Sequence, residues 1–474
     1  MIKRLFPLVC ALLLLAACGE EPPAPIPPAD EAAAAAMDDI CAAHPEEALR
    51  WSAAGDCAET ESAAEFPVTL FYTDAEALTE GLAAEVEAAL AARMEQVKFA
   101  SELCEDGAYR PEILAEAWET ALNGRTAAET SADFTLRLRY DGSAWVAENE
   151  PEIPSLSAAL AAEEAKLAEI IPPRKIYKLD PKTTMGPTPN PEGYLVTEDP
   201  AEIDALLQRP EAQTLLNGRN TVWDSLRERK EGTKLHAYLD ETILVLIWQE
   251  RHIPATLTFA EVFVADASQI VRKLADDTYG SHSLVVPTEF ARQTNAVLLT
   301  DGDFYQLRGR CGVNVWQGEL LHSNGQLGDS CFFDRDGNML FAYAGELATE
   351  EDAARFVEEN GIQTGICFGP VMVDEGVNVC PDFYYIGDYL GELARCAIGQ
   401  VDELHYLVTT ADYYYTVSDL ADELIARGVR SAYNIDGGQS SAIIFQNQQI
   451  NPTIFGAERA QSDCIFFATA MPEK

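Results

Sequence analysis

The stretch Ser431-Ala-Tyr-Asn-Ile-Asp-Gly-Gly-Gln-Ser-Ser441 lies between two predicted strands near the C-terminus. Its first five residues have the composition of a strand, and a second apolar strand is predicted from Ala442 to Phe445. Two adjacent glycines, Gly437 and Gly438, let the backbone approach a ligand closely and direct amide hydrogens at an anion. The stretch therefore predicts a ligand-binding turn at the end of a sheet.

Polar side chains flank the glycines. Asp436 stands directly before them and is placed to act as an acid, a base or a metal ligand. Ser440 and Ser441 add hydroxyl groups after them. The alternative is a plain hairpin, because Asp-Gly is also a strong turn signal.

Two arginines precede apolar strands elsewhere in the C-terminal part. Glu458 and Arg459 come before the strand predicted from Cys464 to Phe467, and Arg395 comes before a strand that continues beyond Ala397. A guanidinium group matches phosphate oxygens in a bidentate way. For Arg459 the alternative is an ion pair on the protein surface.

Two carboxylates follow the strand predicted over residues 296–300. Asp301 and Asp303 are predicted to bind a cation or to transfer protons, and the alternative is a turn. By contrast, residues 334–338 are interpreted as a hairpin turn, because no bidentate glutamate follows at the spacing of a calcium loop.

The N-terminus has the pattern of an export signal. Lys3 and Arg4 precede an apolar run over residues 5–15, which is short for a membrane span. The run ends in Leu15-Ala-Ala-Cys18, which resembles the bacterial lipobox, so residues 1–18 are predicted to be a lipoprotein signal peptide with Cys18 as the lipidation site. The alternative is an ordinary secretory signal.

The composition limits the function. The 474 residues carry a formal charge of −45 and are 47% hydrophobic, which predicts two or three folded domains and argues against nucleic acid as a partner. Of the 11 cysteines, Cys10 and Cys18 belong to the signal, and the spacing of the others matches no zinc pattern. A local bridge between Cys41 and Cys57 is conceivable, and Cys367 is predicted to be a buried thiol.

Composition and periodicity also predict the domain organisation. A tether rich in proline, alanine and glutamate is expected over residues 19–64, and a small α+β spacer or binding module over residues 65–150. A linker helix over residues 151–180 then leads into a large domain over residues 181–474.

The large domain is predicted to be α+β, with a large mixed β-sheet and flanking helices. Its strands and helices alternate without a regular βαβ period. Helices are expected at residues 201–208, 268–275, 350–360 and 418–427.

The order of these segments resembles the phosphodiester glycosidase family. The resemblance rests on Asp-Gly-Asp-Phe-Tyr at 301–305, Phe-Gly-Pro-Val-Met-Val at 368–373, Arg-Cys-Ala-Ile-Gly-Gln at 395–400, the 433–441 stretch and Glu-Arg at 458–459. The family includes N-acetylglucosamine-1-phosphodiester α-N-acetylglucosaminidase and bacterial proteins related to exopolysaccharide. Asp301 stands where the family usually has asparagine, and Cys396 and Gln400 also depart from its pattern.

The resemblance implies a hydrolase that cleaves an N-acetylglucosamine-like sugar from a sugar 1-phosphodiester on a cell-surface or extracellular glycan. By this reading Asp436 faces the anomeric carbon or its water, while Arg395, Arg459 and the amides of Gly437 and Gly438 hold the phosphate. The other expected substrate-binding residues are Asp301, Asp303, Asn434, Ser440, Ser441 and Glu458.

Two alternatives remain open: a catalytically inactive surface lipoprotein that binds phosphoglycan, and a metal-dependent phosphodiesterase. No cofactor is required by the sequence, and a calcium or magnesium ion is an option. The expected location is the extracellular face of a bacterial envelope, with the membrane reached through the lipid on Cys18 and a phosphoglycan or sugar phosphate as substrate.

Overall fold

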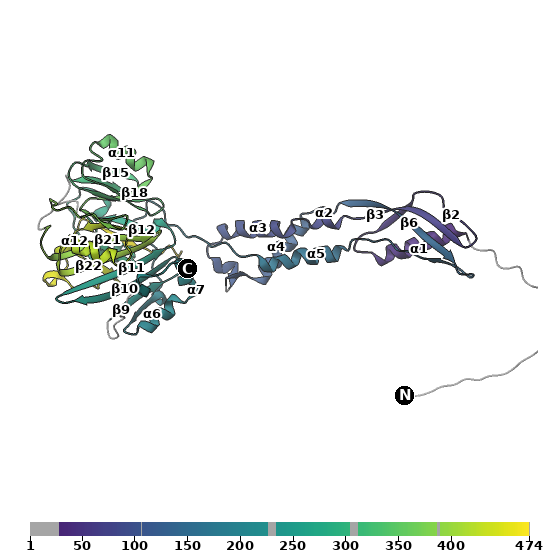
Figure 1. Cartoon of the computed structure of the whole chain (residues 1–474), viewed down its shortest axis with the longest axis horizontal. Helices are drawn as coiled ribbons and strands as arrows, with labels where there is room; N and C mark the ends of the chain where they lie inside the picture. Colours follow the sequence, from purple (N-terminus) through teal and green to yellow (C-terminus); the bar gives the residue numbers. More distant parts are fainter. Residues whose placement is uncertain (1–27, 106, 226–233, 304–310, 386–388, 474) are drawn as a thin grey trace, which may run out of the picture. The chain divides into compact units, whose positions relative to one another are not determined.

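The computed structural model describes residues 28–473, apart from residues 106, 226–233, 304–310 and 386–388 (Figure 1). The predicted signal peptide, Cys18 and the first part of the predicted tether lie outside the described residues. The chain divides into two compact units, Met1–Lys175 and Ile176–Lys474, each with hydrophobic clusters of its own.

The first unit contains an antiparallel sheet covered by one helix. The sheet consists of β1 (Arg50–Ala53), β2 (Ala58–Glu59), β3 (Ala63–Thr73), β6 (Glu129–Tyr140) and β7 (Trp145–Ala147). Helix α1 (Ala29–Ala43) buries Ala29, Ala33 and Met37, which recur every four residues and share one face. The prediction of a tether is therefore wrong from Ala29 onward, because this alanine-rich segment has a helical apolar face and a sheet to pack against.

The remainder of the first unit is mainly helical, with a two-stranded sheet. Its elements are α2 (Ala75–Thr79), α3 (Leu82–Gln96), β4 (Cys104–Glu105), β5 (Ala108–Tyr109), α4 (Pro111–Asn123) and α5 (Leu156–Ala165). The helix expected as a linker is α5, which packs against α2 and α3. It therefore belongs to the first unit, whose boundary falls after Lys175.

The largest sheet of the second unit has nine strands. In spatial order they are β20 (Val377–Asn378), β19 (Val371–Asp374), β23 (Ser431–Ile435), β21 (Leu393–Asp402), β22 (His405–Tyr415), β11 (Ala255–Val264), β10 (Ile243–His252), β9 (Leu235–Leu239) and β8 (Tyr194–Thr197). Most residues of β10, β11 and β22 are buried, so both faces of the sheet centre are covered. The flanking helices are α6 (Pro200–Leu207), α7 (Pro210–Leu216), α8 (Val222–Ser225) and α12 (Val417–Ile425).

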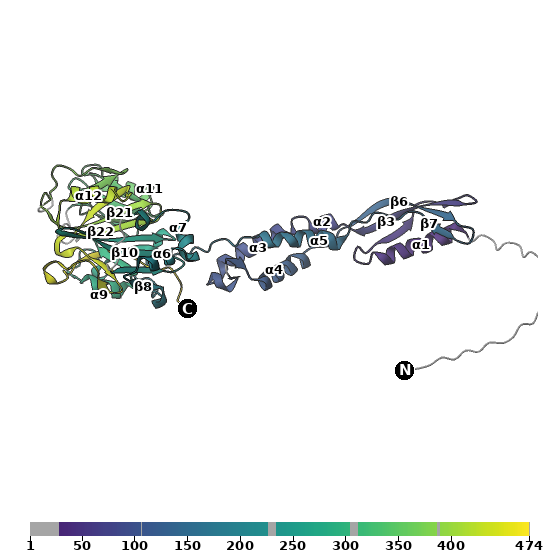
Figure 2. The same ribbon diagram turned by 60° about the horizontal axis from the view of Figure 1, so that its bottom comes forward.

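Two five-stranded sheets complete the second unit. One consists of β12 (Ile270–Leu274), β26 (Asp463–Phe467), β13 (Leu298–Asp301), β24 (Ile443–Phe445) and β25 (Gln448–Gln449), with α9 (Pro287–Thr294) packed on it. The other consists of β15 (Glu319–Asn324), β14 (Gly312–Trp316), β18 (Ile362–Ile366), β16 (Ser330–Asp334) and β17 (Met339–Ala342), beside α11 (Glu350–Glu359). Figure 2 shows α9 and α12 in different parts of the second unit.

The α+β class is confirmed, with two differences from the prediction. Every strand pair in the named sheets of the described residues is antiparallel, where we expected a mixed sheet. The helix expected over residues 268–275 is wrong: β12 occupies Ile270–Leu274 and pairs with β26. Pairing with a buried neighbour outweighs the local helical pattern there.

Two further features can be stated for the described residues. None of their helices is both long and apolar enough to cross a membrane. All nine cysteines among them are free thiols, so Cys41 and Cys57 form no bridge, and Cys367 and Cys464 are buried.

Candidate active site

Asp436 lies where the chain passes from one sheet to another. Strand β23 pairs with β19 and β21 in the nine-stranded sheet, whereas β24, which follows the double glycine, pairs with β13. The hairpin alternative is therefore wrong, because the two strands belong to different sheets. The Asp436 amide donates to the carbonyl of Gly302 at 3.2 Å, which ties this crossover to the end of β13.

Both glycines are required by the backbone of the crossover. A Cβ atom on Gly437 would lie 2.9 Å from the carbonyl oxygen of Ala394, so a side chain would collide with β21. Gly438 has a φ of +64°, in the left-handed region that favours glycine. The Gly437 amide donates to Asp436 Oδ1 at 3.0 Å and so orients the carboxylate rather than pointing at a ligand.

Asp301 lies at the end of β13, close enough to Asp436 for their charges to interact. Neither carboxyl oxygen of Asp301 has a hydrogen-bond partner in the described part of the chain, and the side chain is fully buried. Burial raises the pKa of Asp301 well above its usual range, and the charges of Asp436 and Asp463 raise it further. The Cys396 thiol and the Thr300 hydroxyl oppose this shift only in part. Burial therefore favours the protonated form of Asp301.

Arg459 pairs with Asp436 at the more open end of this group. Its Nη1 lies 4.0 Å from Asp436 Oδ2, and the two side chains are 36% and 11% exposed. The pair thus combines an acidic group with a cation that solvent reaches. A substrate that carries an anionic group next to a reactive carbon would place the anion at Arg459 and the carbon at Asp436.

A second, closed group of charges lies beside the first. Arg272 on β12 donates through Nε to Asp463 Oδ2 at 2.9 Å, and its Nη2 lies 3.2 Å from Asp303 Oδ2. The same guanidinium donates to the carbonyls of Val315 and Gly365. All three charged side chains are fully buried. The single guanidinium binds both carboxylates, compensates part of their charge and holds β12, β26 and the end of β13 together.

Comparison with known proteins assigns a family to the segment that contains Asp436, Asp301 and Arg459. Residues 294–468 match the model of the phosphodiester glycosidase family. This segment belongs to that family. It includes Asp301, Arg395, Asp436 and Arg459, whereas Arg272 lies before it.

The chain also has distant likenesses among solved structures. A zebrafish N-acetylglucosamine-1-phosphodiester alpha-N-acetylglucosaminidase catalytic domain, auto-inhibited by its pro-peptide, is 17% identical over 48% of this chain and 83% of that chain, with a TM-score of 0.39. A hypothetical protein from Synechocystis is 12% identical over 48% and 62% of the two chains, with a TM-score of 0.38.

A Burkholderia pseudomallei protein is 10% identical over 89% and 97% of the two chains, with a TM-score of 0.33. No curated protein matches. Because all three TM-scores are low, the family assignment depends on the match of residues 294–468.

Arg395, the other predicted phosphate ligand in the phosphodiester glycosidase segment, binds backbone carbonyls. Its guanidinium donates to the carbonyl oxygens of Tyr389, Gly391 and Tyr415, and the residue is only 5% exposed. Its backbone adjoins Gly437, but its recorded contacts hold the loop before β21. The backbone of Arg395 thus lies near the crossover, but its guanidinium binds carbonyl groups of the chain. Arg459 is the arginine that pairs with Asp436.

Several predicted substrate ligands are buried around the crossover. Asn434 donates to the Gly369 carbonyl at 2.8 Å, while its Oδ1 has no partner among the described residues. The hydroxyl oxygens of Ser440 and Ser441 are likewise buried without a partner there. Buried polar atoms are usually satisfied, so their concentration near Asp301 is typical of a functional site.

Glu458 and Asp303 are engaged elsewhere in the structure. Glu458 accepts from the amide and the hydroxyl of Thr288, at 3.2 and 2.8 Å, near the start of α9. Asp303 accepts from the Cys367 amide at 3.0 Å in addition to its ion pair with Arg272. Within the described ranges, no group of three or more histidine, cysteine or acidic residues is arranged to hold a metal ion.

Sequence reasoning missed Arg272 because the helix expected over residues 268–275 concealed its partners. A signal was nevertheless present: Arg272 follows Ile270 and Val271, whose β-branched side chains favour a strand. An arginine in a buried strand needs carboxylate partners. Asp463 at the start of another apolar strand was one candidate.

Proposed function

We propose that this chain hydrolyses the glycosidic bond of a sugar 1-phosphodiester, with an N-acetylglucosamine-like sugar as the leading candidate. The observation that carries the proposal is the pairing of Asp436 with the accessible Arg459, beside the buried carboxyl of Asp301, within the phosphodiester glycosidase segment. The family supports a hydrolase that acts on phosphodiester-linked sugars. The arrangement of charges supports the placement of that reaction at Asp436 and Arg459.

In the proposed reaction a water oxygen forms a bond to the anomeric carbon, and the bond between that carbon and the phosphate oxygen breaks. The electron pair stays on the phosphate oxygen, so the products are a free sugar and a phosphomonoester. Asp436 accepts the proton of the attacking water, and Arg459 compensates the charge that grows on the phosphate. A phosphate is a good leaving group, so little proton donation to it is needed.

The raised pKa of Asp301 fits this division of roles. If Asp301 and Asp436 were both ionised, the two negative charges would repel each other and the phosphate. Burial favours the neutral form of Asp301, so the negative charge at the crossover is concentrated on Asp436, next to the partly exposed Arg459. Buried polar groups around the crossover position the sugar when it enters the site. They belong to Asn434, Ser440 and Ser441.

The proposal extends to the location of the chain. The lipobox-like Leu15-Ala-Ala-Cys18 supports a lipid anchor on the extracellular face of a bacterial envelope, where a cell-surface or extracellular phosphoglycan is the substrate. The charge of −45 supports a partner other than nucleic acid. A Cys18→Ser variant is expected to leave the membrane fraction of expressing cells, and retention there would refute the anchor.

The activity is tested by incubating the purified chain with a panel of sugar 1-phosphodiesters, with and without a chelator. We expect release of free sugar from at least one α-linked N-acetylhexosamine diester. Sugar release that the chelator abolishes would assign a role to calcium or magnesium. Tight binding of a phosphoglycan with no release would favour the inactive binding protein and contradict the enzyme.

A further inference from the structure

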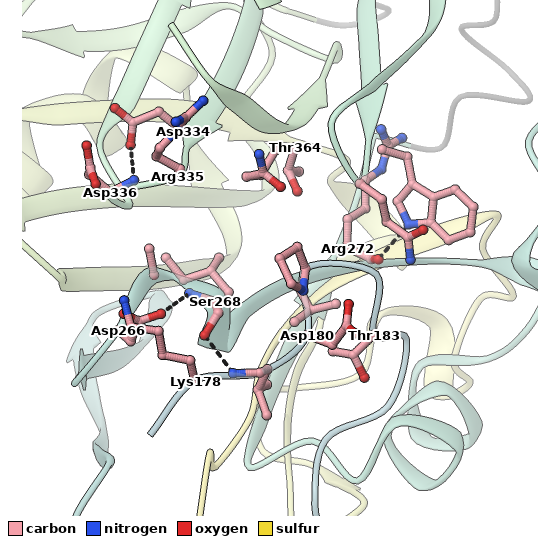
Figure 3. A pocket seen from close by; sticks show the side chains of 18 residues that line it. Lys178, Asp180, Thr183, Asp266, Ser268, Arg272, Asp334, Arg335, Asp336 and Thr364 are labelled. Atoms are coloured by element: carbon pink, nitrogen blue, oxygen red, sulfur yellow. Dashed lines mark hydrogen bonds and ion pairs between the residues drawn. The ribbon is translucent and has the colours of Figure 1, made fainter. Parts of the chain in front are cut away.

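A cavity in the Ile176–Lys474 unit lies outside the group formed by Asp436, Asp301 and Arg459. It has a volume of about 530 Å³, in the range of small-molecule sites. Its walls come from the segment that follows residue 176, the turn before β12, the ends of β14 and β18, and the β16–β17 turn. Figure 3 shows Lys178, Asp180 and Thr183 on one side of it, and Thr364 and Asp334 to Asp336 on the other. We call it the β14–β18 pocket.

The pocket wall contains a hydroxyl that has no hydrogen-bond partner in the described part of the chain. Thr364 is 6% exposed, and its side chain makes no hydrogen bond in the part of the chain that the structure describes. Trp316 is its cross-strand neighbour on β14. A hydroxyl that lines a cavity and has no internal partner is available to donate to and accept from a ligand.

An aromatic ring and amide side chains surround this hydroxyl. The Trp316 indole donates to the carbonyl of Arg272 at 2.9 Å, which fixes the ring in the wall. Gln317 donates to the Lys182 carbonyl at 2.8 Å and keeps its own oxygen as an acceptor. Gln363 lines the pocket as well. Groups that both donate and accept beside a flat apolar ring suit a ligand rich in hydroxyl groups.

The charges in the wall argue against an anionic ligand. Four aspartates, Asp180, Asp266, Asp334 and Asp336, line the pocket together with Lys178 and Arg335. Arg272 contributes backbone there, because its guanidinium is neutralised by Asp303 and Asp463. A phosphate would therefore meet an excess of negative charge.

A cation is disfavoured for a different reason. Asp334 accepts from the amides of Asp336 and Asn338 and from the Asn338 side chain, so it holds the predicted hairpin turn. Asp266 accepts from the Ser268 amide and pairs with Lys178 at 3.0 Å. These oxygens are committed to the fold, and a calcium site needs six or more oxygen ligands.

From these observations we infer that the β14–β18 pocket binds an uncharged saccharide unit. The pocket would hold a neutral part of a glycan chain, away from any phosphate. The inference does not depend on the catalytic role of Asp436, because the two groups of residues are separate.

The test is calorimetric titration of the full chain with a panel of neutral tetrasaccharides built from glucose, galactose, mannose and N-acetylglucosamine. At least one is expected to bind, and Thr364→Val and Gln317→Ala should each weaken that binding by about fivefold or more. The matched control is Thr135→Val, at an exposed position of β6, which should leave binding unchanged. Asp436→Ala should also leave it unchanged.

Three results would overturn the inference: no neutral tetrasaccharide binds, binding is the same in both pocket variants, or glucose 1-phosphate binds more tightly than every neutral sugar. Loss of binding in Asp436→Ala alone would place the saccharide at the other site and would also overturn it. Thermal unfolding of each variant checks the fold, and Gln317→Ala provides the test if Thr364→Val fails to fold.

Discussion

Two groups of carboxylates in the same unit differ in how their charge is balanced. Asp303 and Asp463 share one buried arginine, Arg272, which also binds neighbouring carbonyls. Asp436 has a partly exposed arginine at 4.0 Å, and Asp301 has no hydrogen-bonded partner in the described part of the chain. The first group is closed around Arg272, and its buried ion pairs are typical of a structural role, although Asp303 Oδ1 has no hydrogen-bond partner among the described residues. The second retains unmet polar capacity, which is typical of chemistry.

The largest expected difference between the groups is in turnover. Asp436→Ala should lower kcat by about 10²- to 10⁴-fold, because a positioned acid or base contributes that range. Urea unfolding of the same variant checks that the fold is retained. Sugar release under saturating substrate measures the effect. Glu359→Ala, an exposed acid on α11, is the matched control, and an equal loss there or near-normal turnover in Asp436→Ala would break the comparison.

For the closed group the expected effect is on stability. Arg272→Met should lower the free energy of unfolding by about 3–5 kcal/mol, because it leaves two buried carboxylates unpaired. Urea unfolding followed by circular dichroism provides the measurement. Arg292→Met removes a partly exposed arginine, paired with Glu289, and should cost about 1 kcal/mol or less. Equal costs for the two variants would show that the closed group is not structural.

The two arginines predicted to bind phosphate should also differ, one affecting activity and the other stability. Arg459→Met should lower kcat/KM by about 10- to 100-fold, the equivalent of one charge-assisted hydrogen bond to the phosphate. Arg395→Met should instead destabilise the fold by about 1–3 kcal/mol, because it strands the carbonyls that the guanidinium satisfies. Kinetics and urea unfolding of both variants decide the assignment. An activity loss confined to Arg395→Met would reverse it.

The smallest expected effect is in the pH dependence of stability. Because the folded state raises the pKa of Asp301, its contribution is fully present below the unfolded pKa of about 3.9 and is lost as the pH rises through the folded pKa. Asp301→Asn cannot titrate, so its stability relative to wild type should increase with pH above about 4. Urea unfolding at pH 5 and pH 8 measures this difference. A difference that stays constant would mean that Asp301 is ionised in the folded protein.

Local sequence patterns predicted much of the fold and part of the site. The strands before and after the double glycine, the hairpin of β6 and β7, and helices α4 and α11 follow from residues close in sequence. The motif order led to Asp436 and Arg459, which the structure brings together. These features were accessible because each is determined within a few residues or by a recognisable family pattern.

The remainder depends on contacts between distant residues. No local pattern shows that Arg272 binds Asp303 and Asp463, since β12 becomes a strand only through its pairing with β26. The carbonyl partners of Arg395 are likewise determined by a loop and by the end of β22. An arginine before a strand has the same sequence pattern whether its guanidinium binds a phosphate or backbone carbonyls.

Cleavage of the glycosidic bond is tested most directly by hydrolysing a sugar 1-phosphodiester in water enriched in heavy oxygen. If the Asp436 crossover catalyses cleavage of the glycosidic bond, the label enters the released sugar and is absent from the phosphomonoester. Mass spectrometry of the two products reads the outcome. Label in the phosphate would show that the phosphorus–oxygen bond breaks instead, and would contradict the proposed function.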